Sequence, residues 1–180
     1  MRRRSTTSLT AHQWVYQLII ELNRLDAGRP AEMEGCTEEE LAQIEAESPF
    51  APIPSDYRVF MRLLGRRPGL LFTGTDLTYP ACLGTRQYAL ECAREEDPDV
   101  PVTDTFFIGH HQGYLLYYFR LGDERVWTHE LAGNSPPTAA PNIRAFVEAE
   151  LYGVSPRVWP QMRERAQAQR NRQGTPDSGV

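Results

Sequence analysis

The first stretch of regular hydrophobic spacing predicts a helix over about residues 11–25. Its apolar side chains recur every three or four residues and give one face: Trp14, Leu18, Leu22 and Leu25. Thr10 has a side chain suited to the N-cap position, and Gly28 is placed to end the helix. Burial statistics favour packing of this face on the body of the protein over its display to a partner.

Two more helices are predicted between residues 37 and 65. Thr37 and Glu40 have capping-box spacing at the start of a short acidic helix. The next helix follows Pro54, which suits a first turn because its ring fixes φ and its missing N–H would have no partner there. Gly65 is predicted to end that helix in the left-handed conformation. The apolar stripe of this helix consists of Tyr57, Phe60, Met61 and Leu64.

From residue 70 onward, short apolar runs between turn signals predict mostly strands. A hairpin is expected around the turn at residues 111–113, and a third strand extends it into a meander. Asn142 is placed to cap a closing helix. The predicted elements are, in order, a strand at 70–72, a polar loop at 74–80, a helix at 85–93, strands at 106–108, 114–119 and 125–130, a proline-rich connector at 133–141 and a helix at 143–152.

These elements predict an α+β fold with an antiparallel β-sheet (a meander) flanked by helices. A chain of 180 residues is long enough for one well-buried domain and short for two. We assign this single domain to residues 10–156, after a flexible basic N-terminal tail at 1–9. The arginine-rich C-terminal tail at 157–180 has little apolar patterning and is predicted to be disordered or a frayed helix.

The acidic helix that begins at Thr37 is followed by the pattern Pro-x-Asp-Tyr-x-x-Phe-x-x-x-x-Gly, which runs from Pro54 to Gly65. In this order the two segments resemble the SUKH superfamily, which contains fungal cell-wall-synthesis regulators and bacterial toxin-immunity proteins. The segments 106–114, 126–130 and 143–151 are similar to the family's later strands and closing helix. Two positions depart from the pattern, since Ile53 replaces the usual leucine and Leu64 the usual asparagine.

The resemblance covers about residues 30–152 and implies the same α+β architecture. It also implies a non-catalytic, protein-binding function. The first possibility is an immunity protein that neutralises a cognate bacterial toxin, of nuclease or deaminase type, by direct binding. The second is a regulatory or scaffold protein that acts on endogenous cellular partners, with the arginine-rich tail as a docking arm.

The charge of the chain is unevenly distributed. The net charge is −5, yet residues 5–156 contain 22 acidic and 11 basic side chains and carry about −11. A field of this sign repels nucleic acid and attracts basic proteins, so we expect a basic toxin domain as the partner and no nucleic acid bound to the body. The candidate contact residues lie on predicted loops and exposed faces: Glu38, Glu39, Asp76, Tyr79, Glu95, Glu96 and His111.

The acidic run at residues 32–47 allows two interpretations. It holds seven glutamates and no arginine. Carboxylates near the start of a helix have a local reason to exist, because they interact favourably with the helix dipole. Alternatively, the run is a contact surface for a basic partner.

The sequence does not indicate an enzyme, a metal site or a cofactor. Cys36, Cys82 and Cys92 are odd in number and lack metal-type spacing, so free thiols are expected. His110 and His111 are adjacent, and neighbouring residues on a strand point to opposite faces, so the two side chains do not easily bind one metal ion. No apolar run of about 18 residues occurs, and polar residues interrupt the segment after the basic start. We therefore expect a cytoplasmic protein with no membrane partner.

Overall fold

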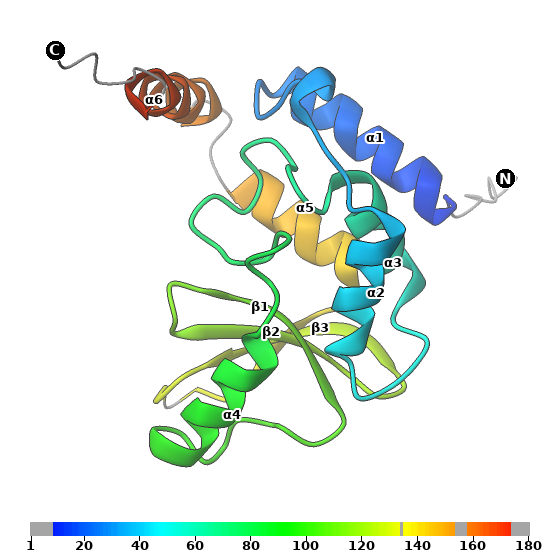
Figure 1. The fold of residues 1–180 in the computed structure, drawn as a ribbon, viewed down its shortest axis with the longest axis vertical. Coiled ribbons are helices and arrows are strands. Elements are labelled where there is room, and N and C mark those ends of the chain that lie inside the picture. Colours follow the sequence, from blue (N-terminus) through cyan, green and yellow to red (C-terminus); the bar gives the residue numbers. More distant parts are fainter. Residues whose placement is uncertain (1–8, 134, 154–157, 174–180) are drawn as a thin grey trace, which may run out of the picture.

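The computed structural model describes residues 9–133, 135–153 and 158–173 (Figure 1). In these residues six α-helices and one four-stranded antiparallel sheet form, so the predicted α+β class is confirmed. The helices are α1 (Ala11–Arg24), the 3-10 helix η1 (Pro30–Glu32), α2 (Glu38–Ala46), α3 (Ser55–Leu64), α4 (Thr85–Glu95), α5 (Ile143–Gly153) and α6 (Val158–Gln173). The strands are β1 (Thr105–His111), β2 (Leu115–Arg120), β3 (Asp123–Glu130) and β4 (Thr138–Ala140).

The sheet is a meander in which each strand pairs with the next one along the chain. The predicted hairpin between β1 and β2 turns at Gln112 and Gly113, whose φ angles are 47° and 76°. Positive φ at both central positions matches the twist of the strands that such a turn joins. The register shifts between Phe107 and Gly109, where β1 contains an irregularity.

Alternate side chains of the sheet enter two separate cores. One face contributes Phe106, Ile108, Phe119 and Val126 to a large core that also contains the buried residues of α1, α2, α3 and α5. The other face contributes Phe107, Leu116 and Tyr118 to a smaller core. That smaller core is closed by α4 through Ala89 and Cys92. The helices therefore cover the sheet unequally, with α4 on the side away from the others (Figure 1).

The apolar stripe predicted for α3 is fully buried at the centre of the large core. Tyr57 meets Phe106 and Phe119 edge to face, with ring centroids 5.8 and 5.6 Å apart. Burial of each such side chain stabilises the fold by about 1.5–3 kcal/mol. The stripe predicted for α1 is likewise buried, and Thr10 and Gln13 form a capping box at its start.

The ends of two helices differ from the prediction. Gly65 has a φ of −62° and is not left-handed, because the amides of Arg66 and Arg67 turn back to the carbonyl of Glu34. The left-handed residue after α1 is Asp26, with a φ of 57°, and not Gly28. Asparagine and aspartate tolerate this conformation better than other side chains.

Two further segments were also assigned wrongly. Residues 70–72 form turns and not a strand, and Leu71 and Phe72 enter the large core from this loop. The proline-rich connector contains β4, which pairs with β3. A strand of three residues is too short to give a periodic pattern.

The packed part of the chain runs beyond residue 156. In α6, Trp159 is buried in the large core, and Arg163 forms ion pairs with Asp26 and Glu32. Of the two alternatives for the C-terminal tail, the structure shows a helix over Val158–Gln173. Residues 1–8 and 174–180 of the predicted tails lie outside the described residues. None of the described helices has the length and apolar character needed to cross a membrane.

Candidate functional site

The C-terminal end of α4 presents several carboxylates to solvent. Four carboxylates near this end are exposed: Glu91, Glu95, Glu96 and Asp99. Glu96 is the C-cap residue of the helix. Among the described side chains, no ion pair joins Glu95, Glu96 or Asp99 to a basic group. The end of a helix carries partial negative charge, so carboxylates there are locally unfavourable. Their presence has no explanation within the fold.

A buried pair holds this acidic end against the sheet. The Oδ2 atom of Asp97 lies 2.9 Å from the Nε2 atom of His129 on β3 and accepts a hydrogen bond from the amide of Ala132 at 3.0 Å. Oδ1 accepts from the amide of Asp99 at 3.0 Å. Burial raises the pKa of Asp97, but these hydrogen bonds outweigh burial and the pKa lies below its usual value. The acidic turn is thus fixed in position, and the sequence did not reveal the pair.

The acidic run at residues 32–47 is, in contrast, matched by arginines of α3 and the turn after it. Glu38 pairs with Arg58 and Arg62. Glu34 and Glu40 both pair with Arg66. These contacts, and the position of Glu38, Glu39 and Glu40 in the first turn of α2, give the run a structural role.

Glu39 lies in the first turn of α2, and Tyr79 contacts this helix through Gln43. Hydrogen bonds from its own backbone amide and from the Thr37 hydroxyl lower the pKa of Glu39, whose side chain is exposed. The hydroxyl of Tyr79 donates to Gln43 at 3.0 Å, and the guanidinium of Arg66 lies 5.8 Å from the tyrosine ring.

A third group forms where the loop before α4 meets the end of β1. Asp76 lies 3.4 Å from the Nε2 atom of His110, and the hydroxyl of Thr75 lies 2.7 Å from the Nδ1 atom of His111. The close approach requires glycine at position 109, because a Cβ there would lie 2.3 Å from the carbonyl oxygen of Asp76. The two histidines therefore face different partners.

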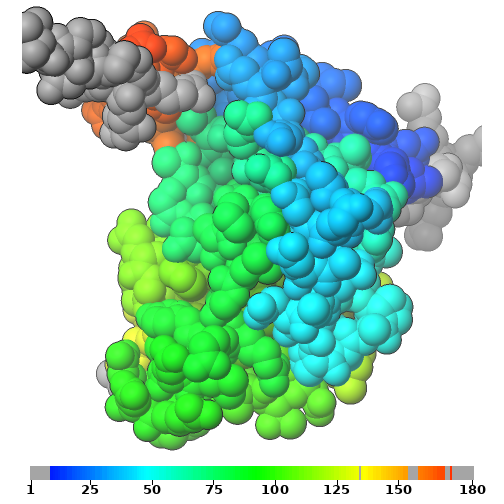
Figure 2. Space-filling view, in the orientation of Figure 1, coloured from blue at the N-terminus to red at the C-terminus, as the bar shows by residue number. Residues whose placement is uncertain are grey.

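The structure thus divides the seven predicted contact residues into three groups. Glu38 and Glu39 lie in α2 and Tyr79 contacts it, while His111 ends β1 and Asp76 lies beside that end in the loop before α4. Glu95 and Glu96 lie at the end of α4. Figure 2 shows α4 and the turn after it, in green, at the lower end of the molecule, away from α1, in blue.

The described residues contain no group of three or more His, Cys, Asp or Glu side chains arranged to hold a metal ion. All three cysteines are free and buried, as expected. Burial raises the pKa of Cys36 to about 11 and that of Cys82 to about 12. Because the thiolate is the nucleophilic form, these values do not favour a reactive cysteine.

Comparisons with protein-family models, with curated proteins and with solved structures found no match for this chain. The resemblance to the SUKH superfamily, and the function that it implies, remain predictions.

Proposed function

We propose that the protein is a non-catalytic, cytoplasmic binding protein that neutralises a cognate bacterial toxin, of nuclease or deaminase type, by direct contact. The observation that carries the proposal is the acidic end of α4, where Glu95, Glu96 and Asp99 are exposed and lack a basic partner among the described residues. Such carboxylates are available to a basic toxin, because no internal ion pair has to break first.

The proposed mechanism is steering followed by occlusion. A nuclease binds a polyanion and therefore tends to have a basic cleft, which carboxylates attract over distances up to the Debye length, about 8 Å at physiological salt. The anchor between Asp97 and His129 keeps the carboxylates in place, so little side-chain and loop entropy is lost when the partner binds.

The alternative function is a regulatory or scaffold protein for endogenous partners. It is supported by α6, which lies at the end of the molecule opposite the sheet in Figure 1 and exposes Arg165. A docking arm of this kind would bind an acidic surface, the opposite of the partner proposed for α4.

Co-expression with the nuclease and deaminase toxin domains encoded in the source genome tests the proposal. We expect the wild-type chain to restore growth against one of them, and the double variant Glu95→Lys/Glu96→Lys to lose affinity for that toxin by about tenfold or more at low salt. A matched control is Glu124→Lys/Glu164→Lys, which changes the charge equally at two exposed positions away from α4. The proposal fails when the wild-type chain protects against none of the toxins.

A further inference from the structure

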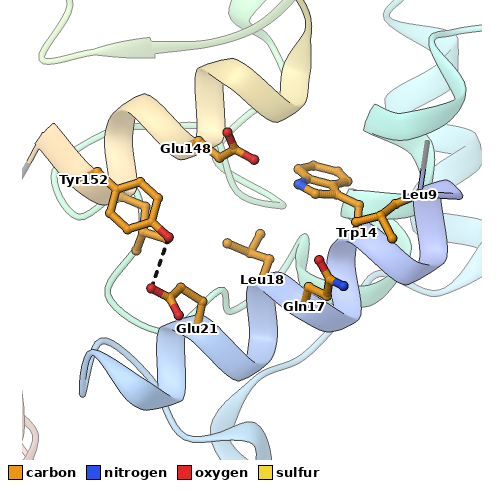
Figure 3. A pocket seen from close by; sticks show the side chains of 8 residues that line it. Leu9, Trp14, Gln17, Leu18, Glu21, Glu148 and Tyr152 are labelled. Atoms are coloured by element: carbon orange, nitrogen blue, oxygen red, sulfur yellow. Dashed lines mark hydrogen bonds between the residues drawn. The ribbon is translucent and has the colours of Figure 1, made fainter. Parts of the chain in front are cut away.

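A groove of about 230 Å³ lies between α1 and α5 (Figure 3). Its apolar lining consists of Trp14, Leu18 and Leu151, which are largely buried, together with Leu9. Small-molecule sites usually enclose about 300–1,000 Å³. The groove is therefore better matched to one long side chain of another protein than to a metabolite.

The two carboxylates at the rim of the groove differ in their partners. The Oε1 atom of Glu21 accepts a hydrogen bond from the Tyr152 hydroxyl at 3.0 Å, and both oxygens accept from Arg24. The charge of Glu21 is therefore balanced. Glu148 stands on the other side of the groove and is exposed, and no hydrogen bond or ion pair to its carboxylate forms among the described residues (Figure 3). One carboxylate thus remains available above an apolar floor.

The indole of Trp14 already interacts with a guanidinium group of the chain. The side chain of Arg144 lies 5.5 Å from the centre of that ring, within the range of a cation–π contact. Its charge is balanced by Asp56, 2.6 Å away. The surroundings of Trp14 are therefore compatible with a cation. Glu148 also attracts Arg144, but it contributes less than Asp56 to raising the pKa of Arg144.

An exposed aromatic side chain extends the groove. Tyr152, at its rim, is 56% exposed. Exposed apolar side chains beside a hollow are typical of a protein contact, and tyrosine is enriched at the centre of such contacts.

We propose that this groove is a docking site for a segment of a protein partner that carries an arginine or lysine beside an apolar residue. The aliphatic stem of the basic side chain lies on Leu18 and Trp14, and its charged end pairs with Glu148. The apolar neighbour covers the ring of Tyr152. The inference rests on the proposed function in that it names a second contact for a basic protein partner, on a different surface from α4.

The proposal is tested with a labelled peptide, acetyl-Ala-Leu-Arg-Leu-Ala-amide, by fluorescence anisotropy with the full chain. We expect Glu148→Gln to weaken binding roughly two- to fivefold, as for a partly solvated ion pair. Tyr152→Ser should weaken binding as well, and replacing the arginine of the peptide by glutamate should abolish it. Glu150→Gln, two residues along the same helix, is the matched control and should bind the peptide as the wild type does.

Three results would overturn the docking site: no binding of the peptide, equal binding by Glu148→Gln and wild type, or binding only after removal of residues 1–8. The last result would mean that the chain's own Arg2–Arg4 occupy the groove. The peptide contains no toxin, so none of these results bears on the growth test. Conversely, failure of every toxin in that test leaves the affinity for the peptide as an independent measurement.

Discussion

At the residue scale, the pair formed by Asp97 and His129 explains how an exposed acidic turn can be rigid. The sequence shows both residues but not their contact, because 32 positions separate them and the approach depends on how the chain returns from α4 to β3. The same holds for Glu148, whose significance comes from its place opposite Glu21 across the groove. Local spacing carries no information on such distant neighbours.

Asp97→Asn should destabilise the fold by about 1–3 kcal/mol at pH 7, since a buried, charge-assisted network loses its charge. The folded-state pKa of Asp97 is lowered, so its contribution is complete above the unfolded pKa and disappears as the pH falls through the folded one. The difference from wild type should therefore shrink below about pH 4. Urea unfolding of both proteins at pH 7 and pH 3 measures this difference in unfolding free energy. An equal difference at the two pH values would contradict a stabilising role for the charged Asp97 carboxylate. Asp99→Asn, at an exposed position, is the control.

At the element scale, the start signals of the helices were more reliable than their ends. The capping boxes at Thr10 and Thr37 are present as predicted, because they depend only on residues three apart. The run at residues 32–47 looked unbalanced because its arginines come from α3 and the turn after it, up to 33 positions away. Helix packing, which spacing within one helix does not specify, brings these charges together.

Gly35→Ala should disrupt the approach of the segment before α2 to α3. A Cβ at position 35 would lie 1.7 Å from the carbonyl oxygen of Arg62, so the backbone has to move, at a cost of about 1–3 kcal/mol or more. Gly153→Ala is the control, because a Cβ there meets no atom within 4 Å and alanine favours a helix. Thermal unfolding of both variants measures the difference. Equal midpoints would show that the contact between the two segments is not tight.

At the scale of the whole molecule, the order of strands and flanking helices was predictable, because the meander follows the chain. The extent of the packed domain beyond residue 156 was not predictable. The apolar pattern fades in α6, and the helix is held by a few contacts: Trp159 in the core, Met162 beside it and the ion pairs of Arg163. A single buried tryptophan gives no periodicity, so a sequence pattern does not distinguish such an anchored helix from a free tail.

Trp159→Ala decides whether α6 belongs to the cooperative domain. The side chain is 1% exposed, and removing a buried tryptophan costs about 3–5 kcal/mol. Part of that loss is offset, because the indole N–H is buried with no hydrogen-bond partner among the described residues. We therefore expect a loss nearer 3 kcal/mol in urea unfolding with one transition. Val158→Ala, at a neighbouring exposed position, should stay within about 0.5 kcal/mol of wild type.

The same variant separates the structural role of α6 from a docking role. When α6 serves only to complete the large core, the folded fraction of Trp159→Ala retains its affinity for the toxin, because α4, which carries the exposed acidic end, packs on the smaller core. A variant that unfolds like the wild type would place the domain boundary before α6, as the sequence predicted. In that case the helix is free to act as an arm, and the scaffold alternative gains support over toxin neutralisation.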